Sequence, residues 1–114
     1  MSFTKEEIDN VTMIKIDEER LDSILAPDLK TELLFLADNG ITKILIDLTN
    51  VRYADSSGLG ALLFGLRQLK NLGGQLKLLG ANSKVMSLIK IARLEGHLHC
   101  FANKSEALIS FKSD

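Results

Sequence analysis

The feature that most constrains the fold is an alternation of strand-like and helix-like segments that begins at residue 11 and continues to the end of the chain. Residues 11–16 and the apolar β-branched run at 44–46 are typical of strands, the second covered on both faces. Apolar side chains at helical spacing within 29–37 and 59–69 predict two amphipathic helices. The resulting order, β-α-β-α-β-α-β-α, predicts an α/β fold with a mostly parallel sheet and right-handed crossovers.

Turn and cap residues mark where these segments begin and end. Asp9-Asn10 tolerates positive φ, so it predicts a tight hairpin that adds an antiparallel strand at the N-terminus, over residues 3–8. The remaining expected elements are a helix from about Pro27 to Asn39-Gly40, a strand at 75–79, a helix at 83–93 that buries Val85, Leu88, Ile89 and Ala92, a strand at 99–101, and a final helix opened by Asn103 and Glu106 in capping-box spacing.

Size and composition predict one domain over residues 1–114. Hydrophobic residues make up 46% and charged residues 25%, as in globular proteins that fold without disulfides. A formal net charge of −1 and dispersed lysines exclude the basic footprint of a direct nucleic-acid binder. Because no apolar run reaches the roughly 18 residues of a membrane span, and residues 1–7 lack the apolar core of a signal peptide, we expect no membrane insertion and a cytoplasmic location.

One stretch is more unusual than the rest, the loop and helix start Asp55-Ser56-Ser57-Gly58-Leu59-Gly60. Asp55, Ser56 and Ser57 are all good helix N-cap types. Gly58 and Gly60 lack Cβ atoms and let another backbone approach closely. From the residues alone, the simplest interpretation is a well-capped helix packed tightly on its sheet.

A second interpretation of this stretch gives Ser56 a regulatory role. The carboxyl ends of strands in an open α/β sheet are where ligands and partners dock, and a serine at the following helix start is expected to be exposed. A helix N-terminus favours a phosphate group, so phosphorylation would leave the domain folded. The added charge, about −1.5 to −2 at neutral pH, would repel an acidic partner surface.

At this stretch the chain resembles the anti-sigma factor antagonists of the STAS superfamily (sulfate transporter and anti-sigma factor antagonist domains), whose hallmark is Asp-Ser-Ser/Thr-Gly-Leu-Gly. The resemblance covers almost the whole chain and implies a single STAS-type domain. Further matches are Leu21-Asp22 in the first loop, Ala26-Pro27-x-Leu29 at the first helix start, and residues 71–78 with the Gly73-Gly74 pair at a helix-to-strand turn.

The resemblance implies a partner-switching cycle in transcription regulation. The unphosphorylated domain would bind an anti-sigma factor that is also a serine kinase, which frees the sigma factor. The kinase would then phosphorylate Ser56 and the complex would separate, until a metal-dependent serine phosphatase restores the first form. The partner-binding residues implied are Asp22, Asp55, Ser56, Ser57, Gly58 and Gly60. No catalytic residue and no cofactor are implied, and we expect a monomer because no heptad pattern is present.

One position departs from the family pattern. Many members carry Gly-Glu-x-Asp before the first helix, whereas this chain has Glu19-Arg20-Leu21-Asp22. Arg20 therefore replaces the acidic residue usually found two positions before the aspartate. If this position contacts the partner, the partner would differ from the usual one or present a more acidic surface.

Other kinds of site are not supported by the sequence. His97, His99 and Cys100 offer too few ligands on one strand face for a closed zinc site. Leu63 occupies the third glycine position of a dinucleotide fingerprint, and no phosphate loop or Gly-x-Ser-x-Gly elbow is present, so we do not expect an enzyme. Two alternatives stay open: a STAS scaffold or accessory subunit of a sensory complex or membrane transporter, and, ranked last, nucleotide binding.

Overall fold

A computed structural model describes residues 2–112, which form seven strands and four helices. The strands are β1 (Phe3–Ile8), β2 (Val11–Ile16), β3 (Arg20–Leu21), β4 (Lys43–Asp47), β5 (Tyr53–Ala54), β6 (Gln75–Leu79) and β7 (Cys100–Phe101). The helices are α1 (Ala26–Asp38), α2 (Ser56–Asn71), α3 (Ser83–Ile91) and α4 (Lys104–Ser110).

Five of the strands form the main sheet, in the order β1-β2-β4-β6-β7. The β1–β2 pair is antiparallel, and every other pair in this sheet is parallel. The predicted α/β class, with a mostly parallel sheet and an N-terminal antiparallel strand, is therefore confirmed. The two remaining strands, β3 and β5, form a separate two-stranded parallel ladder that the sequence did not predict.

The hairpin between β1 and β2 turns at the predicted residues. Asp9 and Asn10 have φ angles of 52° and 68°, the left-handed conformation that both central residues of a type I′ turn require. The turn sets the register in which Ile8 lies opposite Val11. In this register the outer strand β1 is largely exposed, whereas β2 is buried on both faces.

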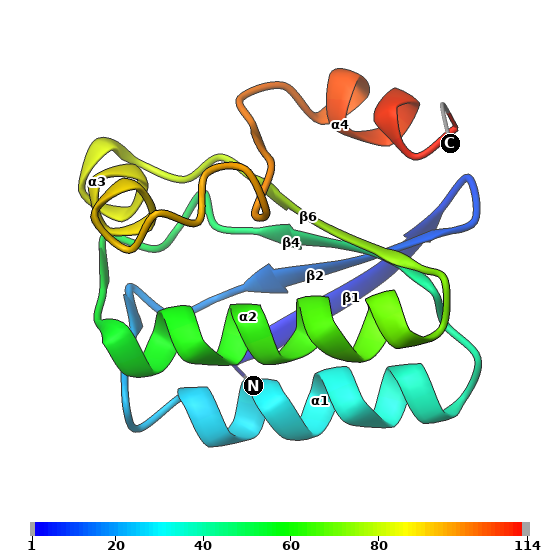
Figure 1. Cartoon of the computed structure of the whole chain (residues 1–114), viewed down its shortest axis with the longest axis horizontal. Coiled ribbons are helices and arrows are strands. Elements are labelled where there is room, and N and C mark those ends of the chain that lie inside the picture. Colours follow the sequence, from blue (N-terminus) through cyan, green and yellow to red (C-terminus); the bar gives the residue numbers. More distant parts are fainter. Residues whose placement is uncertain (1, 113–114) are drawn as a thin grey trace.

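Helices cover the two faces of the main sheet unequally. Figure 1 shows α1 and α2 side by side across one face, while the short helix α4 lies over the other. The larger apolar cluster unites the buried leucines of α1 and α2 with Ile14, Ile44 and Ile46 of the sheet. The smaller cluster joins Phe111, which follows α4, to the opposite sheet face.

The third helix is shorter than predicted and buries a different set of residues. Val85 and Ile89 are buried as expected and Leu88 is partly buried, but Ala92 is exposed. The helix ends at Ile91 with Ala92 as its C-cap, and the chain turns at Arg93, whose φ is 59°. The following loop supplies the missing apolar contact through Leu98, which is buried in the larger cluster.

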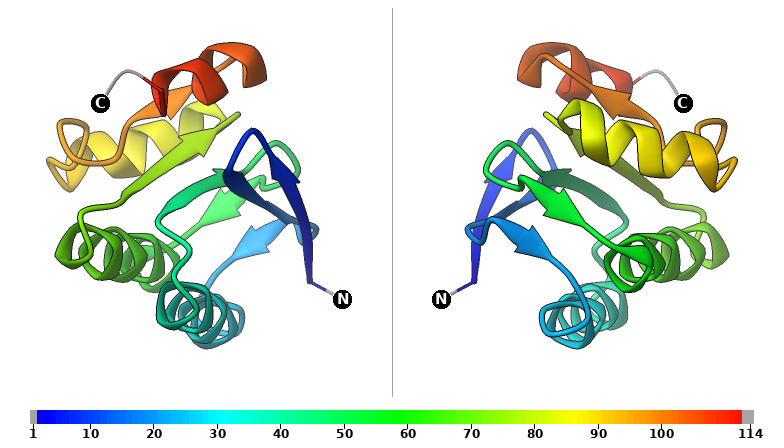
Figure 2. Two further views of the ribbon diagram at one scale, coloured as in Figure 1. Left: turned by 90° about the vertical axis from the view of Figure 1, so that its right-hand side faces the viewer. Right: turned by 90° about the vertical axis from the view of Figure 1, so that its left-hand side faces the viewer.

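The elements that position the candidate site gather at one end of the molecule. The right-hand view of Figure 2 faces this end, where β3 and β5 lie side by side and α3 flanks them. Helices α1 and α2 both begin here. The loops that precede α1 and α2 and the β3–β5 ladder therefore lie on a single surface.

Candidate protein-docking surface

The β3–β5 ladder brings the loop that precedes α1 against the start of α2. Arg20 pairs with Tyr53 and Leu21 with Ala54 in parallel register. The pairing continues one step further, because the Asp55 N–H donates to the Leu21 carbonyl oxygen at 3.2 Å. The residues that follow Leu21 therefore run alongside the first residues of α2.

Gly58 makes this close approach possible. An ideal Cβ built on Gly58 would overlap the Leu21 carbonyl oxygen and would lie 2.8 Å from Leu21 Cγ. Both Gly58 and Leu21 are buried. Gly58, predicted to bind the partner, thus lies beneath the loop and contacts the chain's own backbone.

Asp55 is the residue that caps α2. Its backbone is extended, with φ −114° and ψ −174°, and its carboxylate accepts the Gly58 N–H at 3.0 Å. Ser56 and Ser57 are the first helical residues, and both are exposed. Within residues 2–112 neither hydroxyl bonds to another group of the chain, so both serines are open to solvent and to a modifying enzyme.

Asp22 orders the loop before α1. Its Oδ1 accepts the N–H groups of Ile24 at 3.1 Å and Leu25 at 3.3 Å, and its Oδ2 lies 3.5 Å from Nε of Arg20. Desolvation raises the pKa of Asp22, but the two backbone hydrogen bonds and the Arg20 guanidinium outweigh it, so the pKa lies below its ordinary value. Asp22 therefore carries a full negative charge at neutral pH.

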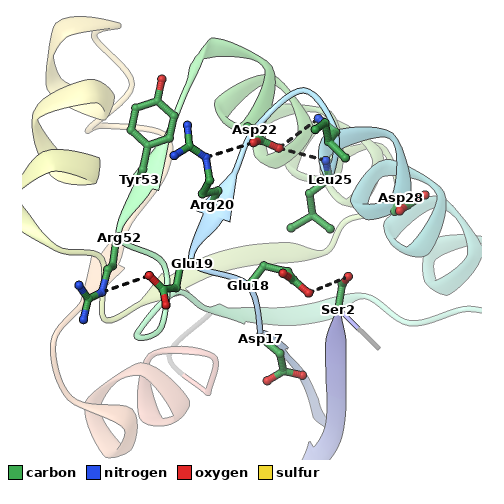
Figure 3. A pocket seen from close by; sticks show the side chains of 11 residues that line it. Ser2, Asp17, Glu18, Glu19, Arg20, Asp22, Leu25, Asp28, Arg52 and Tyr53 are labelled. Atoms are coloured by element: carbon green, nitrogen blue, oxygen red, sulfur yellow. Dashed lines mark hydrogen bonds and ion pairs between the residues drawn. The ribbon is translucent and has the colours of Figure 1, made fainter.

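Arg20 is held between two neighbours on the exposed face of the ladder. Its guanidinium lies 4.7 Å from the centroid of the Tyr53 ring, within the range of a cation–π contact, and on its other side it meets Asp22 (Figure 3). The side chain of Arg20 is nevertheless 67% exposed. The ladder thus presents a positioned arginine to solvent.

A groove of about 830 Å³ runs from this arginine along the loop before α1. Five carboxylates line it against two arginines, and each arginine is paired with a carboxylate, Arg20 with Asp22 and Arg52 with Glu19 at 3.5 Å. The groove therefore has a negative balance and favours basic groups of a partner. The expectation that Arg20, where it contacts the partner, suits a different partner or a more acidic partner surface stays a prediction. The groove is lined by Ser2, Asp17, Glu18, Glu19, Arg20, Asp22, Ile24, Leu25, Asp28, Arg52 and Tyr53.

Two exposed apolar side chains of the groove were not predicted. Ile24 is 83% exposed and Tyr53 is 43% exposed, and such residues are typical anchors of protein interfaces. The available sequence signal for Ile24 was an apolar residue in a polar loop just before a helix. Tyr53 had no comparable signal, because its role depends on the ladder with Arg20.

The structure thus gathers five of the six predicted partner-binding residues on one surface, while Gly58 lies beneath it. Gly60 is partly exposed, and an ideal Cβ there would meet nothing within 4 Å. Hereafter the docking surface means Ser56, Ser57 and Gly60 of α2, its cap Asp55, Asp22, and the groove residues Arg20, Ile24 and Tyr53.

The two histidines and the cysteine near the C-terminus differ in their exposure to solvent. His97 and His99 are exposed, whereas Cys100 is partly buried and burial raises the pKa of its thiol. Among the described residues, no group of three or more His, Cys, Asp or Glu side chains has the arrangement of a metal site. Within the same residues, no helix combines the length and apolar character needed to cross a membrane.

Comparisons with known proteins agree on the fold and the kind of protein. A family model described as "STAS domain" matches residues 2–107. An anti-sigma-B factor antagonist of Staphylococcus aureus is 31% identical over 86 residues, which cover 75% of this chain and 79% of the relative. A candidate anti-sigma factor antagonist from Thermotoga maritima has a TM-score of 0.88 at 23% identity, with 96% of this chain and 94% of that one covered. The phosphorylated form of the Bacillus cell fate determinant SpoIIAA has a TM-score of 0.75 at 21% identity, with coverage of 95% and 97%.

Proposed function

The chain belongs to the STAS domain family, and on that premise we propose that it is an anti-sigma factor antagonist controlled by phosphorylation of Ser56. In its unphosphorylated form it binds an anti-sigma factor with serine kinase activity through the docking surface. The observation that carries the proposal is the exposed Ser56 hydroxyl at the first position of α2, flanked by the ordered Asp22 loop and the Asp55 cap. The Staphylococcus relative supports the antagonist role by its name, and SpoIIAA supports the switch because a phosphorylated form is known.

Phosphorylation of Ser56 would act on the interface and leave the fold intact. Asp55, and not Ser56, caps the helix, so the modification removes no hydrogen bond that the domain needs. The helix N-terminus tolerates the added negative charge. In a closed complex, however, the phosphate would be desolvated beside the Asp22 and Asp55 carboxylates, which opposes binding.

The groove charges define the partner surface that this switch needs. Five carboxylates against two paired arginines suit basic kinase groups opposite the groove. Ser56 does not line the groove, so its phosphate would meet a different part of the kinase face. Such a complex would form quickly at low salt and more slowly as salt screens the groove. A serine phosphatase would reverse the modification. We propose that this cycle takes place in the cytoplasm, and that the chain is a monomeric binding domain and not an enzyme.

The test is phosphorylation and capture with the anti-sigma kinase candidates of the source organism, purified and supplied with ATP. We expect one phosphate on Ser56 by mass spectrometry, none in Ser56→Ala, and phosphate still on Ser56 in the matched control Ser57→Ala, which removes the neighbouring exposed hydroxyl. Ser56→Asp should weaken kinase binding at least tenfold, or about 1.4 kcal/mol.

Two results would contradict the proposal. One is phosphate on Ser57 instead of Ser56. The other is a Ser56→Asp variant that binds the kinase as tightly as the unmodified protein. Constant absence of phosphate on Ser56, together with co-purification of transporter or sensory-complex subunits, would support the scaffold or accessory role.

A further inference from the structure

Arg20 lies where a phosphate on Ser56 would need a counter-charge. β3 and β5 are parallel, so both run toward the start of α2. The Arg20 guanidinium reaches toward the carboxylate of Asp22, the residue that directly follows β3, with Nε 3.5 Å from Oδ2. It therefore points in the direction in which β5 leads to Ser56.

We propose that Arg20 is the phosphate-binding residue of the switch: when Ser56 is phosphorylated, the guanidinium turns from Asp22 to pair with the phosphate. This inference rests on the proposed function only in taking Ser56 as the phosphorylated residue. It assigns to Arg20 a regulatory contact inside the chain.

Both the Asp22 carboxylate and the phosphate favour the transfer of the guanidinium from one to the other. Asp22 keeps the two backbone N–H groups of Ile24 and Leu25 when the guanidinium leaves, so its carboxylate is not left without hydrogen bonds. The phosphate offers about twice the charge of a carboxylate and three acceptor oxygens, and a guanidinium binds such groups through two parallel hydrogen bonds. The Arg20–Asp22 contact, at 3.5 Å, is longer than a charge-assisted hydrogen bond of about 2.7–2.9 Å.

Tyr53 keeps the arginine close during this exchange. The ring lies 4.7 Å from the guanidinium, so it limits the movement of a side chain that is otherwise largely exposed. In the proposed exchange the guanidinium rotates across the ring face from Asp22 toward the phosphate. Phosphorylation would then withdraw the Arg20 guanidinium from its place in the docking surface.

The experiment uses the full chain with phosphoserine installed at position 56 by genetic encoding, which requires no kinase. The phosphate is titrated by ³¹P NMR, since a nearby guanidinium favours its dianion and lowers its second pKa, ordinarily about 6. We expect Arg20→Gln to raise this pKa by about half a unit, a threefold tighter hold on the proton. Arg20→Lys should retain part of the effect, because a lysine keeps the charge without the bidentate geometry.

Arg52→Gln is the matched control. Arg52 is also an exposed arginine of the groove, with 82% of its side chain exposed and Nε 3.5 Å from Glu19, but it precedes β5 and so lies at the end of the ladder away from Ser56. Asp22 and Asp55, the acidic residues of the docking surface, are unchanged in all three variants. Amide NMR spectra of each variant test whether it is folded.

Equal pKa shifts in Arg20→Gln and Arg52→Gln, or no shift in either, would overturn the proposal, because only net charge would then matter. A displaced Nε–H signal of Arg20 in the phosphorylated wild-type chain would support it independently. Failure of the kinase to modify Ser56 would count against the proposed function and would leave this titration unaffected.

Discussion

The buried and exposed sides of the first turn of α2 lie within six residues of one another but meet different physical demands. On the buried side, Gly58 leaves no room for a Cβ beside Leu21. On the exposed side, Gly60 has open space, and the Ser56 hydroxyl bonds to no other described residue of the chain. The same motif therefore contains residues that the fold requires and residues that the fold leaves available for docking.

This difference implies that stability and partner binding can be changed separately. A substitution on the buried side should destabilise the domain, whereas one on the exposed side should leave it folded. Asp55 belongs to both sides, because its backbone joins the ladder and its carboxylate caps the helix at the surface. Three substitutions test this separation, from the largest expected effect to the smallest.

Gly58→Ala should have the largest effect on stability. Its methyl group would overlap the Leu21 carbonyl oxygen, a backbone atom that can move only if the β3–β5 ladder separates from α2. Overpacking of this kind costs about 2 kcal/mol or more of unfolding free energy, measured by urea denaturation. An unfolding free energy within about 0.5 kcal/mol of wild type would show that the buried side tolerates a side chain, and the comparison would fail.

Asp55→Ala should cost about 1 kcal/mol, the usual effect of losing an N-cap. The substitution leaves the Gly58 N–H without its side-chain acceptor. Asp55→Asn is the matched control, since an asparagine caps a helix as well as an aspartate does and removes only the charge. If Asp55→Asn lost as much stability as Asp55→Ala, the charge and not the cap would be responsible.

Gly60→Ala should give the smallest effect and the opposite sign. The position is helical and open, so replacing glycine should increase the unfolding free energy by up to about 1 kcal/mol. The same denaturation experiment measures it beside Gly58→Ala, an identical change two residues away. A loss of more than about 1 kcal/mol would mean that Gly60 also serves the fold.

Local patterns in the sequence predicted most of the architecture. The apolar spacing of α1 and α2 matched their buried faces, including Leu29, Leu33, Leu62 and Leu66. These signals succeed because helix periodicity, turn conformations and caps depend on residues only a few positions apart. The same reasoning placed Ser56 at an exposed helix start.

Other features escaped the sequence because they depend on contacts between distant segments. A two-residue strand has no periodicity, so nothing in residues 20–21 or 53–54 revealed the β3–β5 ladder. The turn at Arg93 and the exposure of Ala92 depend on how the loop after α3 packs. The acidic groove combines residues from three separate stretches of chain, at Ser2, within 17–28 and at 52–53.

The sequence by itself determined the α/β order of the elements, the helix that begins at the Asp-Ser-Ser motif, and the family that the chain resembles. Only the tertiary structure decided that Gly58 contacts Leu21, that Arg20 lies between Tyr53 and Asp22, and that the surrounding charge is negative. The physical reason is range: backbone preferences act between near neighbours in the chain, whereas steric exclusion and electrostatic pairing act between whichever groups the fold brings together.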